Sequence, residues 1–130
     1  MRNLIFVYPI LFATSVEAQD LDCANAMAQT ELTFCAEQDW MAADTDLNDA
    51  YGSARDVMRQ IDSELPQSER GAEMNLTEGQ RAWIVFRDKI CAAEGYIMHG
   101  GSAEPMLVYG CRARLTRVRA EDLWQMAQPY

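Results

Sequence analysis

Four cysteines are the residues of this 130-residue chain whose type and spacing best support a defined chemistry. That chemistry could be metal binding or disulfide formation. Structural zinc sites usually take their ligands from pairs about two to four residues apart, and no such cysteine pair occurs here. An even number of cysteines behind an apolar leader instead indicates an oxidising compartment. The sequence therefore predicts two disulfides and no metal site, and the cysteines concerned are Cys23, Cys35, Cys91 and Cys111.

Four cysteines allow three pairings, and the spacing favours one of them. Cys91 and Cys111 each lie ten residues from position 101, at the centre of a glycine-containing loop. In an antiparallel helical hairpin that turns there, the two would face each other at the same height. Cys23 and Cys35 are twelve residues apart, so the first segment can fold back onto the helix that follows. We therefore expect Cys23–Cys35 and Cys91–Cys111, each stabilising the fold by about 3 kcal/mol.

The segment from Gly95 to Pro105 holds the single histidine, together with a serine and a glutamate. His99, Ser102 and Glu104 raise the question of a hydrolase site. A catalytic triad needs a rigid scaffold and an oxyanion hole, and three residues within six positions of one flexible loop do not resemble that arrangement. No nucleotide, flavin or haem motif occurs either. The sequence therefore predicts neither an enzyme nor a bound cofactor.

The same loop is the best candidate for direct contact with a protein partner. Its centre is His99, Gly100, Gly101 and Ser102, flanked by apolar residues, and the expected second disulfide would anchor both of its ends. The alternative is that the two glycines simply permit a tight turn and that the histidine is an ordinary exposed residue.

These residues must be positioned by helices, because apolar and small residues recur at steps of three and four. A long amphipathic helix is expected between Thr30 and Leu65, a second from about Glu69 to Glu94, and a third from Ala103 or Pro105 to Met126. No strand-like alternation of useful length is present. The predicted fold is all-α: a disulfide-stapled antiparallel bundle of three main helices with a short N-terminal helical turn, which Asp22 could cap.

The helical spacing also predicts which side chains are buried. On the second helix these are Leu76, Gln80, Trp83, Arg87 and Ile90, with Ile84, Val85 and Phe86 widening the stripe; on the third they are Leu107, Val108, Cys111, Leu115, Val118 and Leu123. Trp40 and Tyr51 are expected in the core, whereas Trp124 and Tyr130 are free for partner contacts. Gly79 costs a helix about 1 kcal/mol relative to alanine, which predicts a close approach there.

Five polar residues lie on or beside these packing stripes: Asp44, Asn48, Gln80, Arg87 and Arg119. A buried arginine needs a carboxylate and further acceptors. We therefore expect a structural network that joins Arg87 to Asp44, with Asn48 and Gln80 completing the hydrogen bonds. The alternative is that these groups line a ligand cleft.

Residues 1–18 have the pattern of a signal peptide: a basic start, the apolar run Leu4–Ala13 and the small-x-small ending Val16-x-Ala18. The run is shorter than the roughly 20 residues that a membrane span requires. We therefore expect cleavage after Ala18, no membrane span, and a single soluble domain over residues 19–130 that is periplasmic or secreted.

The net charge of −9 is unevenly distributed, because residues 19–69 carry twelve Asp/Glu and only two Arg. Solubility is the expected main role of this charge; the acidic surface also repels nucleic acid and anionic lipid and favours a cationic partner. The one basic cluster is expected to pair with the acidic first helix; the alternative is that it binds an anionic envelope polymer. Its members are Arg112, Arg114, Arg117 and Arg119.

Three spaced blocks of residues resemble a known family. They are Cys23…Thr30-Glu31-Leu32…Cys35 followed by Ala43-Asp44-x-x-Leu47-Asn48-x-x-Tyr51; Leu76-x-x-x-Gln80-x-x-Trp83-x-x-x-Arg87-Asp88-x-x-Cys91; and Gly101-Ser102…Cys111-x-x-x-Leu115-Thr116-x-x-Arg119-x-x-x-Leu123. Together they resemble the LprI-type lysozyme inhibitor family, specifically its N-terminal-like helical domain.

This resemblance implies a periplasmic or cell-surface protein that inhibits lysozyme. Glycosidases of this kind carry two carboxylates in their cleft, which a histidine and a serine on a projecting loop could hydrogen-bond. The acidic body would steer the chain towards a basic lysozyme. The alternative function is a periplasmic structural or adaptor protein that binds an envelope protein without inhibiting an enzyme.

Overall fold

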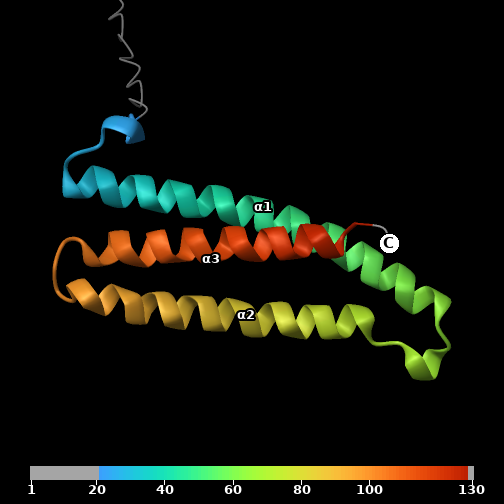
Figure 1. Cartoon of the computed structure of the whole chain (residues 1–130). Coiled ribbons are helices and arrows are strands. Elements are labelled where there is room, and N and C mark those ends of the chain that lie inside the picture. Colours follow the sequence, from blue (N-terminus) through green and yellow to red (C-terminus); the bar gives the residue numbers. More distant parts are fainter. Residues whose placement is uncertain (1–20, 129–130) are drawn as a thin grey trace, which may run out of the picture.

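A computed structural model describes residues 21–128 of the chain, and in this range the fold is a bundle of three long helices in which successive helices run antiparallel (Figure 1). The all-α prediction is confirmed, and no strand occurs among the described residues. The predicted signal peptide and Tyr130 lie outside the described range. The long helices are α1 (Gln29–Glu64), α2 (Ala72–Gly95) and α3 (Glu104–Met126), and the short 3-10 turns are η1 (Cys23–Asn25), η2 (Gln67–Glu69) and η3 (Tyr96–Met98).

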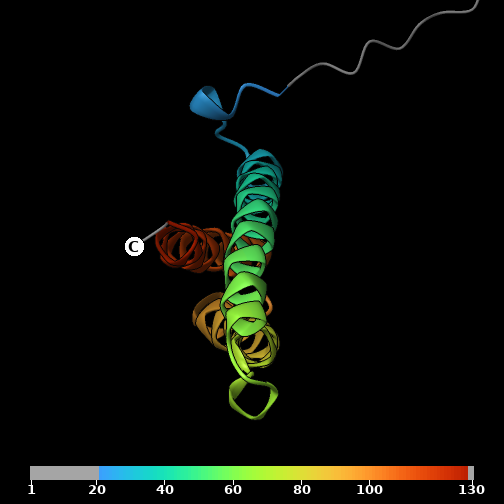
Figure 2. The same ribbon diagram turned by 90° about the vertical axis from the view of Figure 1, so that its right-hand side faces the viewer.

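The three helices do not pack against one another in the same way. Helices α2 and α3 run side by side as a hairpin, and α1 crosses this pair obliquely (Figures 1 and 2). None of the helices in residues 21–128 is both long and apolar enough to cross a membrane.

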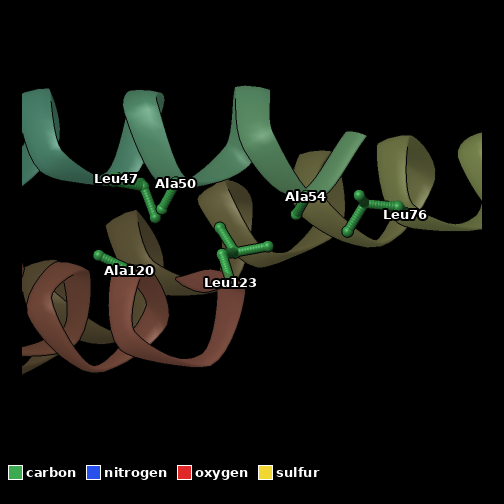
Figure 3. Packing of buried hydrophobic residues seen from close by; sticks show 6 residues of the cluster. All are labelled: Leu47, Ala50, Ala54, Leu76, Ala120 and Leu123. Carbon is green, nitrogen blue, oxygen red and sulfur yellow. The ribbon is translucent and has the colours of Figure 1, made fainter. Parts of the chain in front are cut away.

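The core lies where α1, α2 and α3 meet, and small residues let the helices approach one another. Ala50 and Ala54 of α1 and Ala120 of α3 are fully buried. Around them pack three leucines whose burial contributes about 1.5–3 kcal/mol each. The cluster is Leu47, Ala50, Ala54, Leu76, Ala120 and Leu123 (Figure 3).

Both predicted cysteine pairs form disulfides. Cys23 and Cys35 have Cα atoms 5.6 Å apart, and the bond ties η1 to the start of α1. Cys91 and Cys111 have Cα atoms 5.4 Å apart and are buried between α2 and α3. As predicted, Asp22 caps η1, since its carboxylate accepts a hydrogen bond from the backbone N–H of Ala24 at 3.1 Å.

The predicted buried stripe of α2 is too wide. Val85 and Phe86 are 62% and 58% exposed, and Ile84 and Ile90 are also exposed. The prediction for Val118 on α3 is wrong in the same way. Each helix contacts its neighbours through a narrow face only, so residues that flank the stripe remain in solvent.

The expected close approach at Gly79 is also wrong. A Cβ atom placed there would meet nothing within 4 Å. The close approach is instead at Gly95, the last residue of α2, where a Cβ atom would lie 2.6 Å from Cγ2 of Val108 on α3. The sequence showed which glycines lie in helices but could not show which of them faces a neighbouring helix.

The junction of α1 and α2 is fixed by the carboxylate of Asp62. Its Oδ1 accepts hydrogen bonds from the N–H groups of Gly71 and Ala72 at 2.9 Å each, and its Oδ2 accepts one from Glu73 at 3.0 Å. These three donors would otherwise be unsatisfied at the start of α2. Because they stabilise the charged form, they lower the pKa of Asp62 below its ordinary value.

Replacing Asp62 with asparagine is expected to lower the melting temperature by about 5 °C at neutral pH. A group whose pKa is lowered by folding stabilises the protein above its ordinary pKa and loses that effect as the pH falls through its folded pKa. The Asp62→Asn variant should therefore lose stability less steeply than the parent below about pH 4. Thermal melts across that range test this. Asp49→Asn, an exposed change on the same helix, should keep the parental pH slope; an equal slope in both variants would contradict the assignment.

Candidate functional site

The turn between α2 and α3, residues 96–103, forms one end of the hairpin (Figure 1), and we call it the tip. Gly100 has a φ of 78°, a left-handed conformation that favours glycine. The N–H of Gly101 donates to the carbonyl of Met98 at 2.9 Å, and a Cβ atom on Gly101 would lie 3.1 Å from that oxygen. Both glycines are therefore required by the geometry of the turn.

Glu104, the first residue of α3, holds the tip in place. Its Oε2 accepts a hydrogen bond from the N–H of Gly100 at 2.8 Å, and its Oε1 lies 3.2 Å from Nδ1 of His99. The pKa of Glu104 is lowered, first by the backbone hydrogen bond and then by the histidine. The ring of His99 also stacks on Tyr96, with centroids 4.3 Å apart. The predicted contact residue His99 thus has a fixed orientation.

Three consecutive large apolar side chains project from the tip into solvent. Tyr96, Ile97 and Met98 are 65%, 73% and 50% exposed. Exposed apolar groups that lie together are typical of interaction sites. The sequence places this segment in the predicted contact loop, where the expected contacts are His99 and Ser102, which are both exposed as well. The signal for the apolar contact is an apolar run just beyond the end of a helix.

The close packing below the tip gives a testable difference between two glycines. Gly95→Ala should cost about 1–3 kcal/mol, because its Cβ would overlap the stiff side chain of Val108. Gly79→Ala should instead stabilise the protein by up to about 1 kcal/mol, because that helical position is open. Chemical denaturation of the two variants measures both values. Shifts in the same direction would contradict the described packing.

A second polar cluster surrounds Arg87 of α2, whose side chain is only 6% exposed. Its Nη1 donates to Oδ1 of Asp44 on α1 at 3.2 Å and to Oγ1 of Thr116 on α3 at 3.3 Å. Its Nε donates to Oδ1 of Asp88 at 3.0 Å. One guanidinium therefore connects all three helices.

Aromatic rings enclose the same guanidinium. The Cζ atom of Arg87 lies 5.6 Å from the ring centroid of Trp40 and 5.3 Å from that of Trp83, which is within cation–π range. Trp40 also stacks on Tyr109, with centroids 5.7 Å apart. The helical spacing predicts Trp40 and Trp83 in the core but does not indicate that they flank Arg87.

The predicted network is divided into two parts. Gln80 does not bond to Arg87 or Asp44; its Oε1 accepts from Nε of Arg119 on α3 at 3.0 Å. Gln80 precedes Arg87 by two helical turns, about 10 Å along the axis, so it faces a different level of the bundle. Asn48 does join the first part, by donating to Oδ2 of Asp44 at 3.4 Å.

Some of these residues also line an open groove of about 470 Å³ between α1 and α2. The network and the cleft that the sequence presented as alternatives therefore coexist, and Arg87 belongs to both. The lining residues are Asp44, Leu47, Asn48, Tyr51, Arg55, Thr77, Gln80, Arg81, Ile84 and Arg87. In residues 21–128 no group of three or more His, Cys, Asp or Glu is arranged to hold a metal ion.

The basic cluster of α3 pairs differently from the prediction. Among the ion pairs of residues 21–128, Arg117 is the one member of the cluster that pairs with a carboxylate of α1, that of Asp39. Arg112 and Arg114 pair with α2, and their ion pairs are Arg112–Asp88 at 3.4 Å and Arg114–Glu94 at 2.9 Å. Trp124, which was expected to be free, donates its indole N–H to Asp46 of α1 at 3.0 Å.

Comparison with known proteins gives two matches. The model of a family described as lysozyme inhibitor LprI matches residues 22–123, a span that includes all four cysteines, the tip and the Arg87 cluster. An uncharacterized protein of Rhizobium meliloti (strain 1021) is 43% identical over 110 residues, which cover 82% of this chain and 79% of the relative. No solved structure matches the chain.

Proposed function

The chain belongs to the LprI lysozyme inhibitor family, and from this membership we propose that it is an exported helical module that inhibits a lysozyme with its tip. The observation that supports this proposal is the exposed apolar run from Tyr96 to Met98, which lies beside His99 on a turn anchored by a disulfide. A rigid, projecting and partly apolar turn is well suited to enter an enzyme cleft, because little conformational freedom is lost on binding.

The tip offers the chemistry that a lysozyme cleft would recognise. Two carboxylates flank the bond that such enzymes cleave, and they accept hydrogen bonds. Ser102 can donate a hydrogen bond from its hydroxyl group. Because Nδ1 of His99 faces Glu104, the Nε2–H group of the ring is left to donate a second one. Tyr96 and Ile97 would cover the apolar walls of the cleft. The tip would therefore occupy the position of the substrate.

The charge distribution favours approach to a basic enzyme. Helix α1 carries nine Asp/Glu and two Arg, so it supplies a long-range attractive field. Steering of this kind raises the association rate more than it raises affinity. The acidic α1 guides the partner in this proposal, and the tip makes the specific contact.

Export from the cytoplasm is the second part of the proposal. Residues 1–18 would direct the chain out of the cytoplasm, and residues 19–130 would form the mature domain. Lysozyme cleaves peptidoglycan in the same extracytoplasmic space, where the two disulfides also form and persist.

An activity assay tests the proposal. Oxidised residues 19–130 are titrated into lysozymes of several types, and lysis of a peptidoglycan suspension is followed by turbidity. Inhibition that saturates at one inhibitor per enzyme is expected. The absence of inhibition across all types would overturn the proposal and favour the adaptor role. The protein without lysozyme should leave the muropeptide profile of the suspension unchanged.

A further inference from the structure

One exposed surface of α2 has an apolar centre and lies on the side of the helix opposite Arg87. We call it the outer face of α2, and it consists of Glu78, Ala82, Val85, Phe86, Lys89 and Ala93. The buried residues of α2, such as Leu76, Gln80 and Cys91, lie on the opposite side of the helix. Val85 and Phe86 are both more than half exposed, and no described residue covers them.

The outer face is symmetrical about its own midpoint. At about 100° per residue, its six members fall within a sector roughly 100° wide. Their numbers pair around the point between Val85 and Phe86: these two form the inner pair, Ala82 and Lys89 form the next, and Glu78 and Ala93 form the outer pair. A two-fold axis through that point would place each residue opposite its counterpart on a second copy.

We propose that two copies of this chain dimerise through the outer face of α2, with the two helices antiparallel. Val85 then packs against Phe86 of the second copy at the centre. The stem of Lys89 covers Ala82, and its ammonium group reaches Glu78 of the second copy one turn away. The two-fold axis repeats this ion pair on the other side, so the face is complementary to itself in shape and in charge.

Charge favours a second copy as the occupant. The outer face carries one acidic and one basic residue, Glu78 and Lys89, so it is neutral although the whole chain carries −9. An antiparallel pairing on this face also keeps the two acidic α1 helices on opposite sides of the dimer. A closed two-fold contact uses the same surface on both copies.

The size of the face indicates a weak dimer. From Glu78 to Ala93 the helix extends about 22 Å, and with a width of about 10 Å it offers a footprint of only some 200 Å². Stable interfaces bury about 800 Å² per partner. The dimer is therefore expected to be weak, and self-association should depend strongly on concentration.

Sedimentation equilibrium of oxidised residues 19–130 tests the dimer between about 10 µM and 1 mM. The mean mass should rise towards twice the monomer mass. Phe86→Asp should weaken association at least tenfold, whereas Val118→Asp, which introduces the same charge at an exposed position on α3, should leave it unchanged. A monomer at all concentrations, or association that Phe86→Asp does not affect, would overturn the proposal.

A charge exchange tests the register. Glu78→Lys and Lys89→Glu should each weaken association severalfold, since each places like charges together, and the double variant should restore it. If both single variants associate weakly and the double variant does not recover the parental association, the antiparallel arrangement would be overturned. The residues of the tip are unchanged in all of these variants. Lysozyme inhibition by each variant can therefore be measured separately from its self-association, and the two proposals can fail independently.

Discussion

Replacing Arg87 with methionine is expected to lower the free energy of unfolding by about 2–3 kcal/mol. The guanidinium bonds to Asp44, Asp88 and Thr116 and so connects three helices. Removing one partner of a fully buried ion pair costs about 3–5 kcal/mol. The cost is smaller here because both carboxylates are about 40% exposed and remain hydrated. Methionine still fills part of the space between the two tryptophans.

Urea denaturation of the oxidised domain measures this loss. Arg81→Met is the matched control, because Arg81 lies on the same helix and lines the same groove but is exposed and pairs with no described carboxylate. It should change stability by less than about 0.5 kcal/mol. If Arg87→Met melted like the parent yet lost all inhibition, the groove rather than the tip would be the binding site.

Replacing Ile97 with aspartate is expected to weaken lysozyme inhibition by about 100-fold. The side chain is 73% exposed and has no role in the core, so the fold should be unaffected. In the proposed complex the new carboxylate would be desolvated near the two carboxylates of the enzyme, and like charges brought together are strongly unfavourable.

The inhibition constant of the variant is compared with that of Val118→Asp. This control adds the same charge at an exposed position on α3, more than two turns from the tip. It should inhibit like the parent, and both variants should keep the parental melting temperature within about 2 °C. Equal inhibition by the parent and both variants would mean that the tip does not contact the enzyme.

Local sequence signals predicted the helices and the disulfides, because the spacing of apolar residues and the positions of glycine and proline are local properties. The steps of three and four from Ala43 to Ala54 defined the seam of α1, and the glycine loop gave the pairing of Cys91 with Cys111. The exposure of Val85 was not predictable in this way. Periodicity shows that a helix has an apolar side, but the width of the contact depends on how its neighbours cross it.

The candidate sites show the same limit. The sequence indicated that Arg87 needs a carboxylate and that Asp44 is one, and both follow from the cost of burying a charge. It could not indicate that Gln80 bonds to Arg119 instead, because that choice depends on the axial level at which α2 and α3 meet. The close approach at Gly95 rather than Gly79 has the same cause.

Hydrogen exchange of the domain with and without saturating lysozyme tests the proposed contact at the tip most directly, because bound amides are protected wherever the contact lies. New protection is expected at residues 96–104, with unchanged exchange along the groove at residues 44–55. New protection in the groove, with exchange at the tip unchanged, would mean that the groove and not the tip contacts the enzyme.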